Sequence, residues 1–371
     1  MTPITGRPVR IGFIGCGQIS RKHLQAYKDI PNAEVIAGAD INPEARDRVA
    51  AEFGIPHLYS DFRQMLQRDD IDAVDICLHN NFHLPATLAA LEAGKHVYCE
   101  KPITGSHADA VTMVDAATGT DLLLHIQLAT LYQNETRAAK ELIEGGHLGN
   151  VYHARSTGYR RRGRPYVDGY GTPTFVQKRN AAGGAIYDMG VYHISQLLYL
   201  LDNPKVTRIS GKTYQEIAMD EPRRADSVYD VEELGIGLVH FANNVTLDII
   251  EAWAINIDSF EGSSIVGSKG GVRLDPFSFS CTFGDLDITG TANLDQTRYL
   301  WDKVRGDGVL YGSSQDHWIG ALQGLIPLLP TAQLALNTML ISEGIYLSDR
   351  LGREVSADEV VKSSVSTAIG I

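Results

Sequence analysis

The sequence predicts an α/β protein with two domains. Residues 1–127 are expected to surround a parallel sheet, and residues 128–371 to form an α+β domain with an open, mostly antiparallel sheet. The first third alternates short apolar runs with helical patterns, which is typical of a sheet covered by helices on both faces. After residue 127, strand-like segments follow one another without intervening helices. A chain of 371 residues is also long enough for two hydrophobic cores.

The strands expected in the first domain are apolar along their whole length, as buried parallel strands are. They are predicted over residues 9–15, 33–40, 72–78, 95–100 and 121–127. The helices between them have recognisable ends. Asn42 is a helix cap, a helix over 85–94 ends at a glycine, and Ser106 with Asp109 forms a capping box.

The second domain is predicted to begin with a helix and a strand over 150–159, followed by a helix over 184–201. Further strands are expected over 205–215, 232–241, 245–254 and 263–266. The glycines of 267–271 predict a hairpin turn. A last amphipathic helix over 331–352 closes the chain and is free to pack back on the first domain.

The formal net charge of −12 excludes nucleic acid and anionic membrane surfaces as expected partners. No apolar run is long enough to span a bilayer, and the first ten residues lack the apolar core of a signal peptide, so we expect a cytoplasmic protein. The four cysteines lack the spacing of metal ligands, and we expect free thiols and no metal.

A glycine-rich turn follows the first strand, with the pattern G-x-G-x-x-S over residues 15–20. Gly15 permits the tight turn, and Gly17 lets the backbone approach a diphosphate at the start of the next helix, where Gln18 and Ile19 stand. The second strand ends in Asp40, which can accept hydrogen bonds from an adenosine ribose. The context predicts a Rossmann domain. The alternative is a simple turn with Asp40 as a helix cap.

Ile41 follows Asp40, and neither arginine nor serine comes directly after the acid. Because Asp40 would repel a 2′-phosphate, NAD is the expected cofactor and NADP is disfavoured.

Several further motifs resemble the Gfo/Idh/MocA oxidoreductase family. They are "ICLHNNFH" (76–83), "CEKPIT" (99–104), "GGAIYDMGVYH" (183–193), "GSKGGVRLDP" and the terminal "LISEGIYLSDRLGREV". The resemblance covers nearly the whole chain. It implies a nicotinamide cofactor across the strand ends, a sugar or cyclitol substrate reacting at a secondary carbon, and a homodimer or homotetramer formed through the open sheet.

The resemblance also implies a set of residues along the cofactor. These are Leu78, His79, Asn80, His83, Glu100, Lys101 and Gln127, besides the glycine turn and Asp40. The chain departs from the family where Leu78-His79 replaces a usual Thr-Pro, and a hydrogen-bonded loop residue is the simpler interpretation of His79. Gln127 stands where an Asn-x-Arg-like stretch is usual, so substrate specificity cannot be transferred there.

By the same resemblance, Lys101 lies between the cofactor and the substrate hydroxyl. Its ammonium group would stabilise the alkoxide that forms as hydride leaves. Pro102 makes a cis bond plausible at this point, and burial could lower the pKa of Lys101. Glu100 would contact the nicotinamide ribose or orient Lys101. The alternative is a surface ion pair between the two side chains.

Hydride transfer from a carbinol also requires a group that takes the hydroxyl proton. At about 100° per residue, Asp188 and Tyr192 lie about 40° apart on one helix face, whereas His193 lies about 140° from Asp188. We therefore expect Tyr192 to relay the proton, with its pKa lowered by Lys101, and Asp188 to anchor the substrate or the relay. If the helix is irregular after Gly190, His193 takes that place instead.

An arginine cluster in this acidic chain is the candidate substrate handle. The expected binding residues are Tyr159, Arg160, Arg162, Arg164 and Lys178, together with Lys101, Asp188 and Tyr192. Arginines of this kind bind carboxylate, phosphate or sulfonate groups. The alternative is solvated or intersubunit ion pairing.

The predicted function is NAD-dependent oxidation or reduction at a secondary hydroxyl of a sugar, cyclitol or sugar derivative. The arginine cluster leaves open whether this substrate carries an anionic group. The alternative is an NAD-dependent glycoside hydrolase acting on an anionic, for example sulfonated or carboxylated, glycoside through transient ring oxidation, elimination and re-reduction. A third reading, an NAD-sensing regulatory protein, does not explain Lys101, Asp188 and Tyr192.

Overall fold

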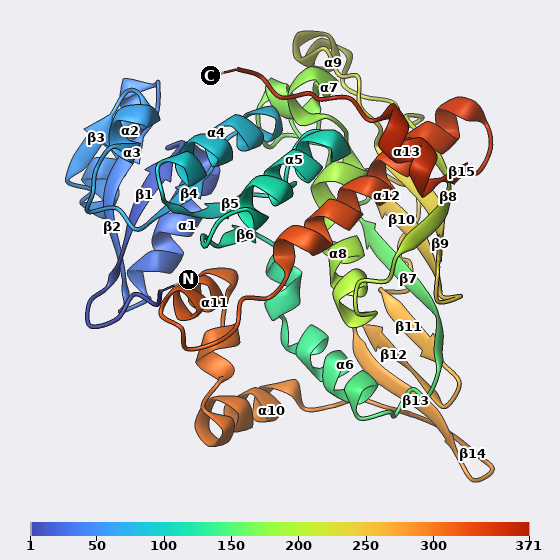
Figure 1. The fold of residues 1–371 in the computed structure, drawn as a ribbon. Coiled ribbons are helices and arrows are strands. Elements are labelled where there is room, and N and C mark those ends of the chain that lie inside the picture. The colour runs from blue at the N-terminus through green and yellow to red at the C-terminus, as the bar shows by residue number, and fades with distance from the viewer. Residues whose placement is uncertain (1, 371) are drawn as a thin grey trace.

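The computed structural model describes residues 2–370, which build two sheets with helices between and around them (Figure 1). The strands of the first sheet are β1 (Val9–Ile14), β2 (Ala33–Ala39), β3 (His57–Tyr59), β4 (Ala73–Ile76), β5 (His96–Cys99) and β6 (Leu124–Ile126). They are all parallel, in the order β3-β2-β1-β4-β5-β6. From β1 the strands are added first on one side, as β2 and β3, and then on the other, as β4 to β6, so the strand order reverses between β1 and β4, which is where ligands bind in sheets of this kind.

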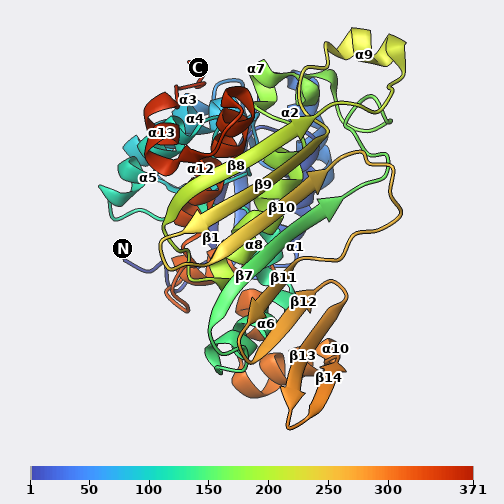
Figure 2. The same cartoon turned by 90° about the vertical axis from the view of Figure 1, so that its right-hand side faces the viewer.

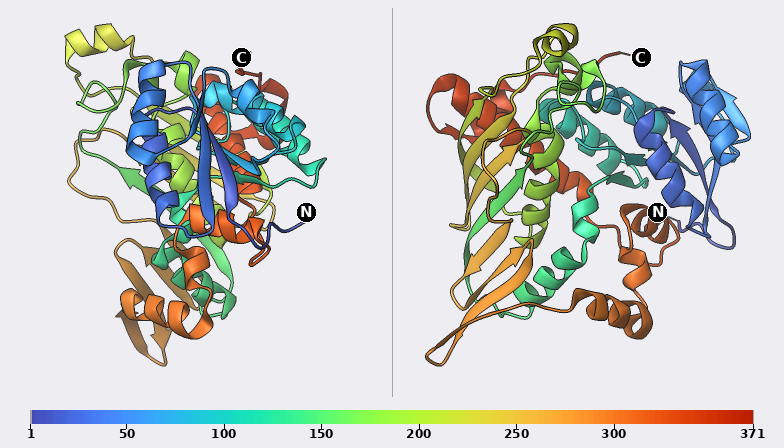
Figure 3. Two further views of the ribbon diagram at one scale, coloured as in Figure 1. Left: turned by 90° about the vertical axis from the view of Figure 1, so that its left-hand side faces the viewer. Right: turned by 180° about the vertical axis from the view of Figure 1, so that it is seen from behind.

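Helices cover both faces of this sheet (Figure 3, left). They are α1 (Gln18–Lys28), α2 (Pro43–Phe53), α3 (Phe62–Leu66), α4 (Asn80–Glu92) and α5 (His107–Thr118). The predicted N-caps are present, since the Asn42 side chain accepts the N–H of Glu44 and Ser106 accepts that of Asp109. The predicted capping box is only half formed, because the Asp109 carboxylate accepts from Thr367 and not from the Ser106 N–H. The parallel sheet predicted from the alternating pattern is confirmed.

The start of α4 differs from the prediction, because the helix begins at Asn80 and contains Pro85 in its interior. A proline inside a helix leaves the carbonyl four residues earlier without its usual donor. That carbonyl belongs to Asn81, and it accepts the N–H of Ile369 at 3.0 Å. The C-terminal segment therefore satisfies the group that Pro85 leaves open, and the helix extends by five residues.

The second sheet contains β7 (Val151–Tyr159), β8 (Val206–Tyr214), β9 (Leu234–Phe241), β10 (Thr246–Ala252), β11 (Ser264–Gly267), β12 (Gly270–Leu274), β13 (Phe277–Phe283), β14 (Leu286–Gly290) and β15 (Val355–Ser356). Its order is β14-β13-β12-β11-β7-β10-β9-β8-β15. The β7–β10 pair is parallel and the other described pairs are antiparallel, as predicted for a mostly antiparallel sheet. No helix lies across its outer face in Figure 2.

The helical segments of the second part are η1 (Ala129–Tyr132), α6 (Asn134–Glu144), η2 (Pro173–Val176), α7 (Lys178–Ala181), η3 (Ile186–Gly190), α8 (Val191–Leu200), α9 (Glu221–Ser227), α10 (Leu294–Leu300), η4 (Trp301–Arg305), η5 (Gly308–Tyr311), α11 (Ser314–Leu322), α12 (Thr331–Leu351) and α13 (Ala357–Ser363). Helix α12 packs against α5 on one side and β8 on the other (Figure 3, right). The last long helix thus joins the two parts.

The region from residue 270 to residue 322 was not predicted from the sequence. It forms the strands β12–β14 and the helices α10 and α11, and α11 returns to the first sheet. Trp318 and Leu322 of α11 are fully buried in one cluster with Val9 and Phe13 of β1. The predicted boundary between residues 127 and 128 remains a prediction, since later segments complete the first core.

Within residues 2–370, no helix combines the length and the apolar character needed to cross a bilayer. The four cysteines are free thiols, and Cys16, Cys77 and Cys99 are buried. Cys16 and Cys99 pack in the hydrophobic clusters, as expected of small core residues, whereas the Cys77 thiol lies 3.3 Å from Asp75 Oδ1 and 3.5 Å from His23 Nδ1.

Candidate active site

The glycine turn between β1 and α1 has the geometry of an anion-binding site. Gly15 has a φ of +96°, and a Cβ there would lie 2.4 Å from the carbonyl oxygen of Cys77, so only glycine fits. A Cβ at Gly17 would meet no atom within 4 Å, so there is open space in front of the turn. No side chain caps α1, and its first turn contains no acid. Its free N–H groups can therefore receive a diphosphate.

The side chains around this turn are arranged for the adenosine end of a dinucleotide. The Asp40 carboxylate accepts the N–H of Cys16 at 2.7 Å and that of Asn42 at 2.8 Å, which holds it beside the turn. Each carboxylate oxygen retains a lone pair for a ribose hydroxyl. Ile41 is 90% exposed next to it. The sequence did not predict that the guanidinium of Arg46 donates to the Asp40 carbonyl.

The other predicted cofactor residues stand in the first turn of α1 or just after the carboxyl ends of β4 and β6. Gln18 is exposed and Ile19 half-buried in the first turn of α1. Leu78 packs towards Gly15, where a Cβ would lie 3.0 Å from its methyl group. Gln127, at the carboxyl end of β6, has a buried Oε1 without a hydrogen-bond partner. An orphaned acceptor of this kind suits a donor on a ligand, such as a carboxamide.

The histidines of this region have structural contacts. His79 is an exposed residue at the N-cap of α4 and uses no side-chain cap bond. His83 is fully buried, and its ring nitrogens lie 2.9 Å from the carbonyl oxygen of Pro102 and 3.0 Å from that of Leu78. The predicted cofactor contact of His83 is therefore wrong, because backbone carbonyls occupy both nitrogens. Asn80 donates to the carbonyl of Ala181 in the second domain.

Lys101 and Asp188 join the two domains at the candidate site. The Lys101–Pro102 bond is cis, as anticipated. Lys101 Nζ donates to Asp188 Oδ1 at 2.8 Å and to its carbonyl oxygen at 3.0 Å. The second carboxylate oxygen, Oδ2, accepts Trp253 Nε1–H at 2.9 Å. The surface ion pair between Glu100 and Lys101 that was the alternative is not present, since both residues are shielded and the ammonium turns to Asp188.

The pKa of Lys101 shifts in the direction opposite to the prediction. Burial lowers it, but the charge of Asp188, with contributions from Tyr192 and Glu100, raises the pKa above its ordinary value. Burial would raise the pKa of Asp188, yet Lys101 and the Trp253 hydrogen bond hold it below its ordinary value. The pair is therefore an ammonium and a carboxylate at neutral pH.

Tyr192 lies next to this pair, with Lys101 Nζ 4.7 Å from the centre of its ring. Burial raises the pKa of Tyr192 to about 12, although the charge of Lys101 acts to lower it. The predicted lowering of this pKa is therefore wrong, because desolvation of the phenolate outweighs the attraction of the ammonium. Tyr192 is a phenol, and so a proton donor, at neutral pH.

The helix that carries these residues starts irregularly. Its first turn, η3, is π-helical, and glycine is required at its start because a Cβ at Gly184 would lie 1.9 Å from the Glu232 carbonyl oxygen. A π-helical turn brings residues five apart together, so the regular 100° spacing does not apply between Asp188 and His193. His193 lies beside Gly158 and binds Glu251, with Nδ1 3.0 Å from Oε2. The π-helical turn ends at Gly190 and a regular α-helix follows from Val191, so the irregularity lies before the place where it would bring in His193, and the choice between Tyr192 and His193 stays open.

His193 of α8 and Glu251 of β10 form a dyad. Glu251 is fully buried and also accepts the hydroxyl of Ser156. Burial lowers the pKa of His193, but the charge and hydrogen bond of Glu251 outweigh it, so the pKa lies above its ordinary value. Nε2 of His193 has no hydrogen-bond partner among the described residues, which leaves it available to a ligand.

The arginine cluster divides into three environments. Arg160 lies 3.9 Å from Asp188 Oδ2 and packs over the Tyr170 ring, so it borders the site. Arg162 is exposed on an isolated bridge with Ala254. Arg164 is buried, and its guanidinium binds Asp168 and Glu233 at 2.9 Å each. The predicted substrate contact of Arg164 is wrong, because these carboxylates and two carbonyl oxygens use its donors.

The remaining predicted binding residues lie at the rim or away from it. Tyr159 donates to the Asp258 carbonyl at 3.5 Å and packs edge-on against Phe260. Lys178 is exposed, with its ammonium group 5.9 Å from the centre of the Tyr346 ring. No contact between Lys178 and Lys101 is present among the described residues, and the predicted substrate contact of Lys178 stays a prediction.

Several residues that support the site were missed in the sequence. Glu232 accepts the N–H groups of Gly184 and Ile186 and the Tyr346 hydroxyl, and so holds the start of the helix. Glu251 of β10 supports His193, and Trp253, directly after β10, supports Asp188. Acidic residues inside apolar strand segments were the available signal, because a buried carboxylate needs a partner.

Two family models match consecutive parts of the chain. An oxidoreductase family with an NAD-binding Rossmann fold matches residues 9–128, and the GFO/IDH/MocA C-terminal domain matches residues 136–273.

Two relatives that match nearly the whole chain are named as dehydrogenases of sugars or their glycosides. D-glucoside 3-dehydrogenase of Escherichia coli (strain K12) is 27% identical over 360 residues, which cover 95% of this chain and 98% of the relative. D-apiose dehydrogenase of Paraburkholderia graminis is 26% identical over 361 residues, covering 95% and 91%. Among solved structures, levoglucosan dehydrogenase in complex with NADH has a TM-score of 0.78 at 22% identity and covers 95% of this chain and 99% of that one.

Proposed function

This chain belongs to the Gfo/Idh/MocA family of NAD-dependent oxidoreductases, and on that premise we propose that it oxidises or reduces a secondary hydroxyl carbon of a sugar, cyclitol or sugar derivative. The observation that carries the proposal is the meeting of Lys101 from the first domain with Asp188 and Tyr192 from the second. Relatives that span nearly the whole chain are sugar dehydrogenases, which supports this substrate class.

The residues around the glycine turn fit an NAD cofactor. The start of α1 would hold the diphosphate in the space before Gly17, and Asp40 would bind the adenosine ribose. The orphaned Oε1 of Gln127 would accept from the carboxamide. When bound, NAD accepts the hydride of the carbinol carbon in oxidation and returns it in reduction.

Lys101 and Tyr192 are the proposed groups on the reacting oxygen. Two protons of the Lys101 ammonium are directed at Asp188, so the third is free to bind the substrate oxygen and to stabilise developing negative charge. In the direction of oxidation, the Tyr192 phenol would pass its own proton to water as its oxygen takes the hydroxyl proton of the carbinol, so that Tyr192 ends protonated and the products are a ketone, the reduced cofactor and one proton. Asp188 fixes the ammonium and anchors the relay.

Arg160 is the proposed handle for an anionic substituent on the substrate. It lies closest to Asp188 in the arginine cluster, and its side chain is 40% exposed. A guanidinium in that place binds carboxylate, phosphate or sulfonate in two parallel hydrogen bonds.

We also propose a cytoplasmic homodimer or homotetramer formed through the open sheet. The outer face of that sheet is uncovered in Figure 2, and strand alternation places Leu238 of β9, which is 38% exposed, on that face because its neighbours Val239 and Phe241 are the buried ones. Light scattering on the purified protein tests the oligomer, and a monomeric mass at micromolar concentration would contradict it.

A second candidate function is redox-neutral glycoside hydrolysis, which the His193–Glu251 dyad favours. After oxidation, the ketone acidifies the neighbouring C–H bond, and a base other than the Lys101–Tyr192 pair must remove that proton before the glycosidic group leaves. His193 has an unpartnered Nε2 and a buried carboxylate behind it, which are the attributes of such a base.

The test is a panel of neutral and anionic sugars, cyclitols and aryl glycosides incubated with NAD. Dehydrogenation predicts nicotinamide absorbance that grows in proportion to the ketone formed. Hydrolysis predicts release of the aryl group without net accumulation of reduced cofactor. Neither signal from any compound, with NAD bound, would contradict both functions.

A further inference from the structure

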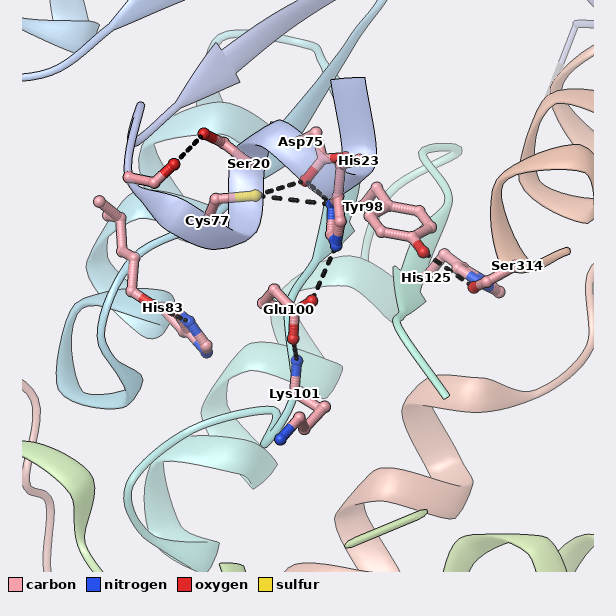
Figure 4. A network of polar contacts seen from close by, with 12 residues as sticks. Ser20, His23, Asp75, Cys77, His83, Tyr98, Glu100, Lys101, His125 and Ser314 are labelled. Carbon is pink, nitrogen blue, oxygen red and sulfur yellow. Dashed lines mark hydrogen bonds and ion pairs between the residues drawn. The ribbon is translucent and has the colours of Figure 1, made fainter. Parts of the chain in front are cut away.

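A series of buried hydrogen bonds connects α1 with Lys101, which directly follows β5 and Glu100 (Figure 4). His23 is 2% exposed and belongs to the helix whose start forms the diphosphate site. Its Nδ1 lies 2.9 Å from Asp75 Oδ2, and its Nε2 lies 2.8 Å from Glu100 Oε1. The other oxygen of Glu100, Oε2, accepts the backbone N–H of Lys101 at 2.8 Å. This hydrogen-bond series therefore links α1, whose start forms the diphosphate site, to the catalytic lysine.

The contacts of His23 determine its protonation. A carboxylate only accepts hydrogen bonds, so an imidazole between two carboxylates must carry a proton on both nitrogens. Burial lowers the pKa of His23, but Asp75 and Cys77 raise it, and the net pKa is well above the ordinary value. Burial raises the pKa of Glu100, whereas His23 and Lys101 hold it below its ordinary value.

The charge of Glu100 could otherwise compete for the catalytic ammonium. Glu100 directly precedes Lys101 and is 4% exposed, so water screens the charge of its carboxylate only weakly. In the structure, His23 and the Lys101 backbone occupy its two oxygens, and Lys101 Nζ binds Asp188 instead. The cation on His23 thus leaves the lysine free to face the substrate.

We propose that His23, held by Asp75, is a positioning residue for Lys101: it neutralises Glu100 and so keeps the ammonium on Asp188 and in the site. Because His23 stands on the helix that receives the diphosphate, the same helix places both the cofactor and the lysine. The inference rests on the proposed function only in that Lys101 is the catalytic cation.

The test compares His23→Gln, Glu100→Gln and the double variant in the full chain. In His23→Gln, the uncompensated Glu100 attracts the ammonium, so we expect kcat to fall on the order of 100-fold with little change in KM. The alkaline limb of the pH profile should move to higher pH, because a second carboxylate then stabilises the ammonium. Removing the charge of Glu100 in the double variant should restore kcat by roughly 10-fold.

A matched control makes the same substitution elsewhere. His317 is also fully buried, and its ring contacts the Leu310 carbonyl and the Leu329 N–H, far along the chain from this site. His317→Gln should change thermal stability and leave the pH profile in place. A fold-loss of kcat in the double variant that equals the product of the losses in the two single variants would overturn the proposal. If His23 had a purely structural role, removing the charge of Glu100 would restore no kcat. If His23→Gln does not fold, Asp75→Asn replaces it, with the same direction expected.

A second readout needs no turnover. In the cofactor-free protein with ¹⁵N-labelled histidine, the His23 ring should show two protonated nitrogens at neutral pH. A single protonated nitrogen would overturn the proposal. A wild-type protein without turnover but with a doubly protonated His23 would instead contradict the proposed function and leave this charge arrangement standing.

Discussion

The ammonium of Lys101 lies 2.8 Å from the carboxylate of Asp188, and this contact joins the two domains at the candidate active site. The two residues come from the end of the parallel sheet and from the first turn of the helix on the open sheet. Each controls the pKa of the other in a place shielded from water.

Asp188→Asn removes the charge that holds the lysine. We expect kcat to fall on the order of 100-fold, because the ammonium loses its fixed position. Asp188 raises the pKa of Lys101, so that pKa falls in the variant, and the alkaline limb of the pH–rate profile should move to lower pH. Asp285→Asn, at an exposed turn, is the matched control and should change neither quantity. An unshifted profile would contradict the assignment.

The two glycines of the turn should respond differently to alanine. At Gly17 the new methyl group meets no protein atom within 4 Å but enters the proposed diphosphate space, so NAD affinity should fall at least about 10-fold, or ~1.4 kcal/mol, with the melting temperature unchanged. At Gly15 the methyl group meets the Cys77 carbonyl and the φ is positive, so stability itself should fall. Calorimetric titration and thermal unfolding measure the two effects. Full NAD affinity in Gly17→Ala would contradict the cofactor site.

The arginine cluster should separate stability from binding. Arg164→Ala leaves Glu233 and Asp168 buried without their cation, so the free energy of unfolding should fall by about 3–5 kcal/mol. Arg160→Ala should leave stability nearly unchanged and raise KM for anionic substrates more than for neutral ones. Arg162→Ala, at an exposed position, is the control. If Arg160→Ala affects neutral and anionic substrates equally, it is not an anion handle.

The identity of the proton relay can be determined from pH profiles. The pKa of Tyr192 is about 12 and that of Lys101 is raised, so oxidation should accelerate from neutral into alkaline pH as protons leave this pair more easily. Tyr192→Phe should lower kcat by roughly 10²–10⁴-fold. His193→Gln should preserve the alkaline rise in dehydrogenation and abolish any glycoside hydrolysis. The reverse pattern, with loss of dehydrogenation only in His193→Gln, would assign the relay to His193.

Features set by short stretches of chain could be predicted. The spacing of Gly15, Gly17 and Asp40 predicted the dinucleotide turn because a tight turn, a close backbone approach and a strand-end acid all depend on local geometry. The motif around Lys101 and the helix around Asp188 predicted which residues meet, although they belong to different domains.

Features that depend on distant partners could not be predicted. Arg164 was expected at the substrate because its neighbours are arginines, whereas its partner Glu233 lies 69 residues away. His23 appeared as one more helix residue, and its partner Glu100 lies 77 residues away. The regular helix assumed for Asp188 and His193 fails because a π-helical turn leaves no clear sign in the sequence.

The most direct test of the central claim follows the hydrogen on the reacting carbon. Sugars and cyclitols of the panel, each deuterated at one secondary carbon, are incubated with NAD and the wild-type chain or Lys101→Met. We predict that the wild type transfers deuterium from one such carbon to the nicotinamide ring, and that Lys101→Met binds NAD but transfers none. Absence of transfer by the wild type with NAD bound, or equal transfer by Lys101→Met, would contradict it.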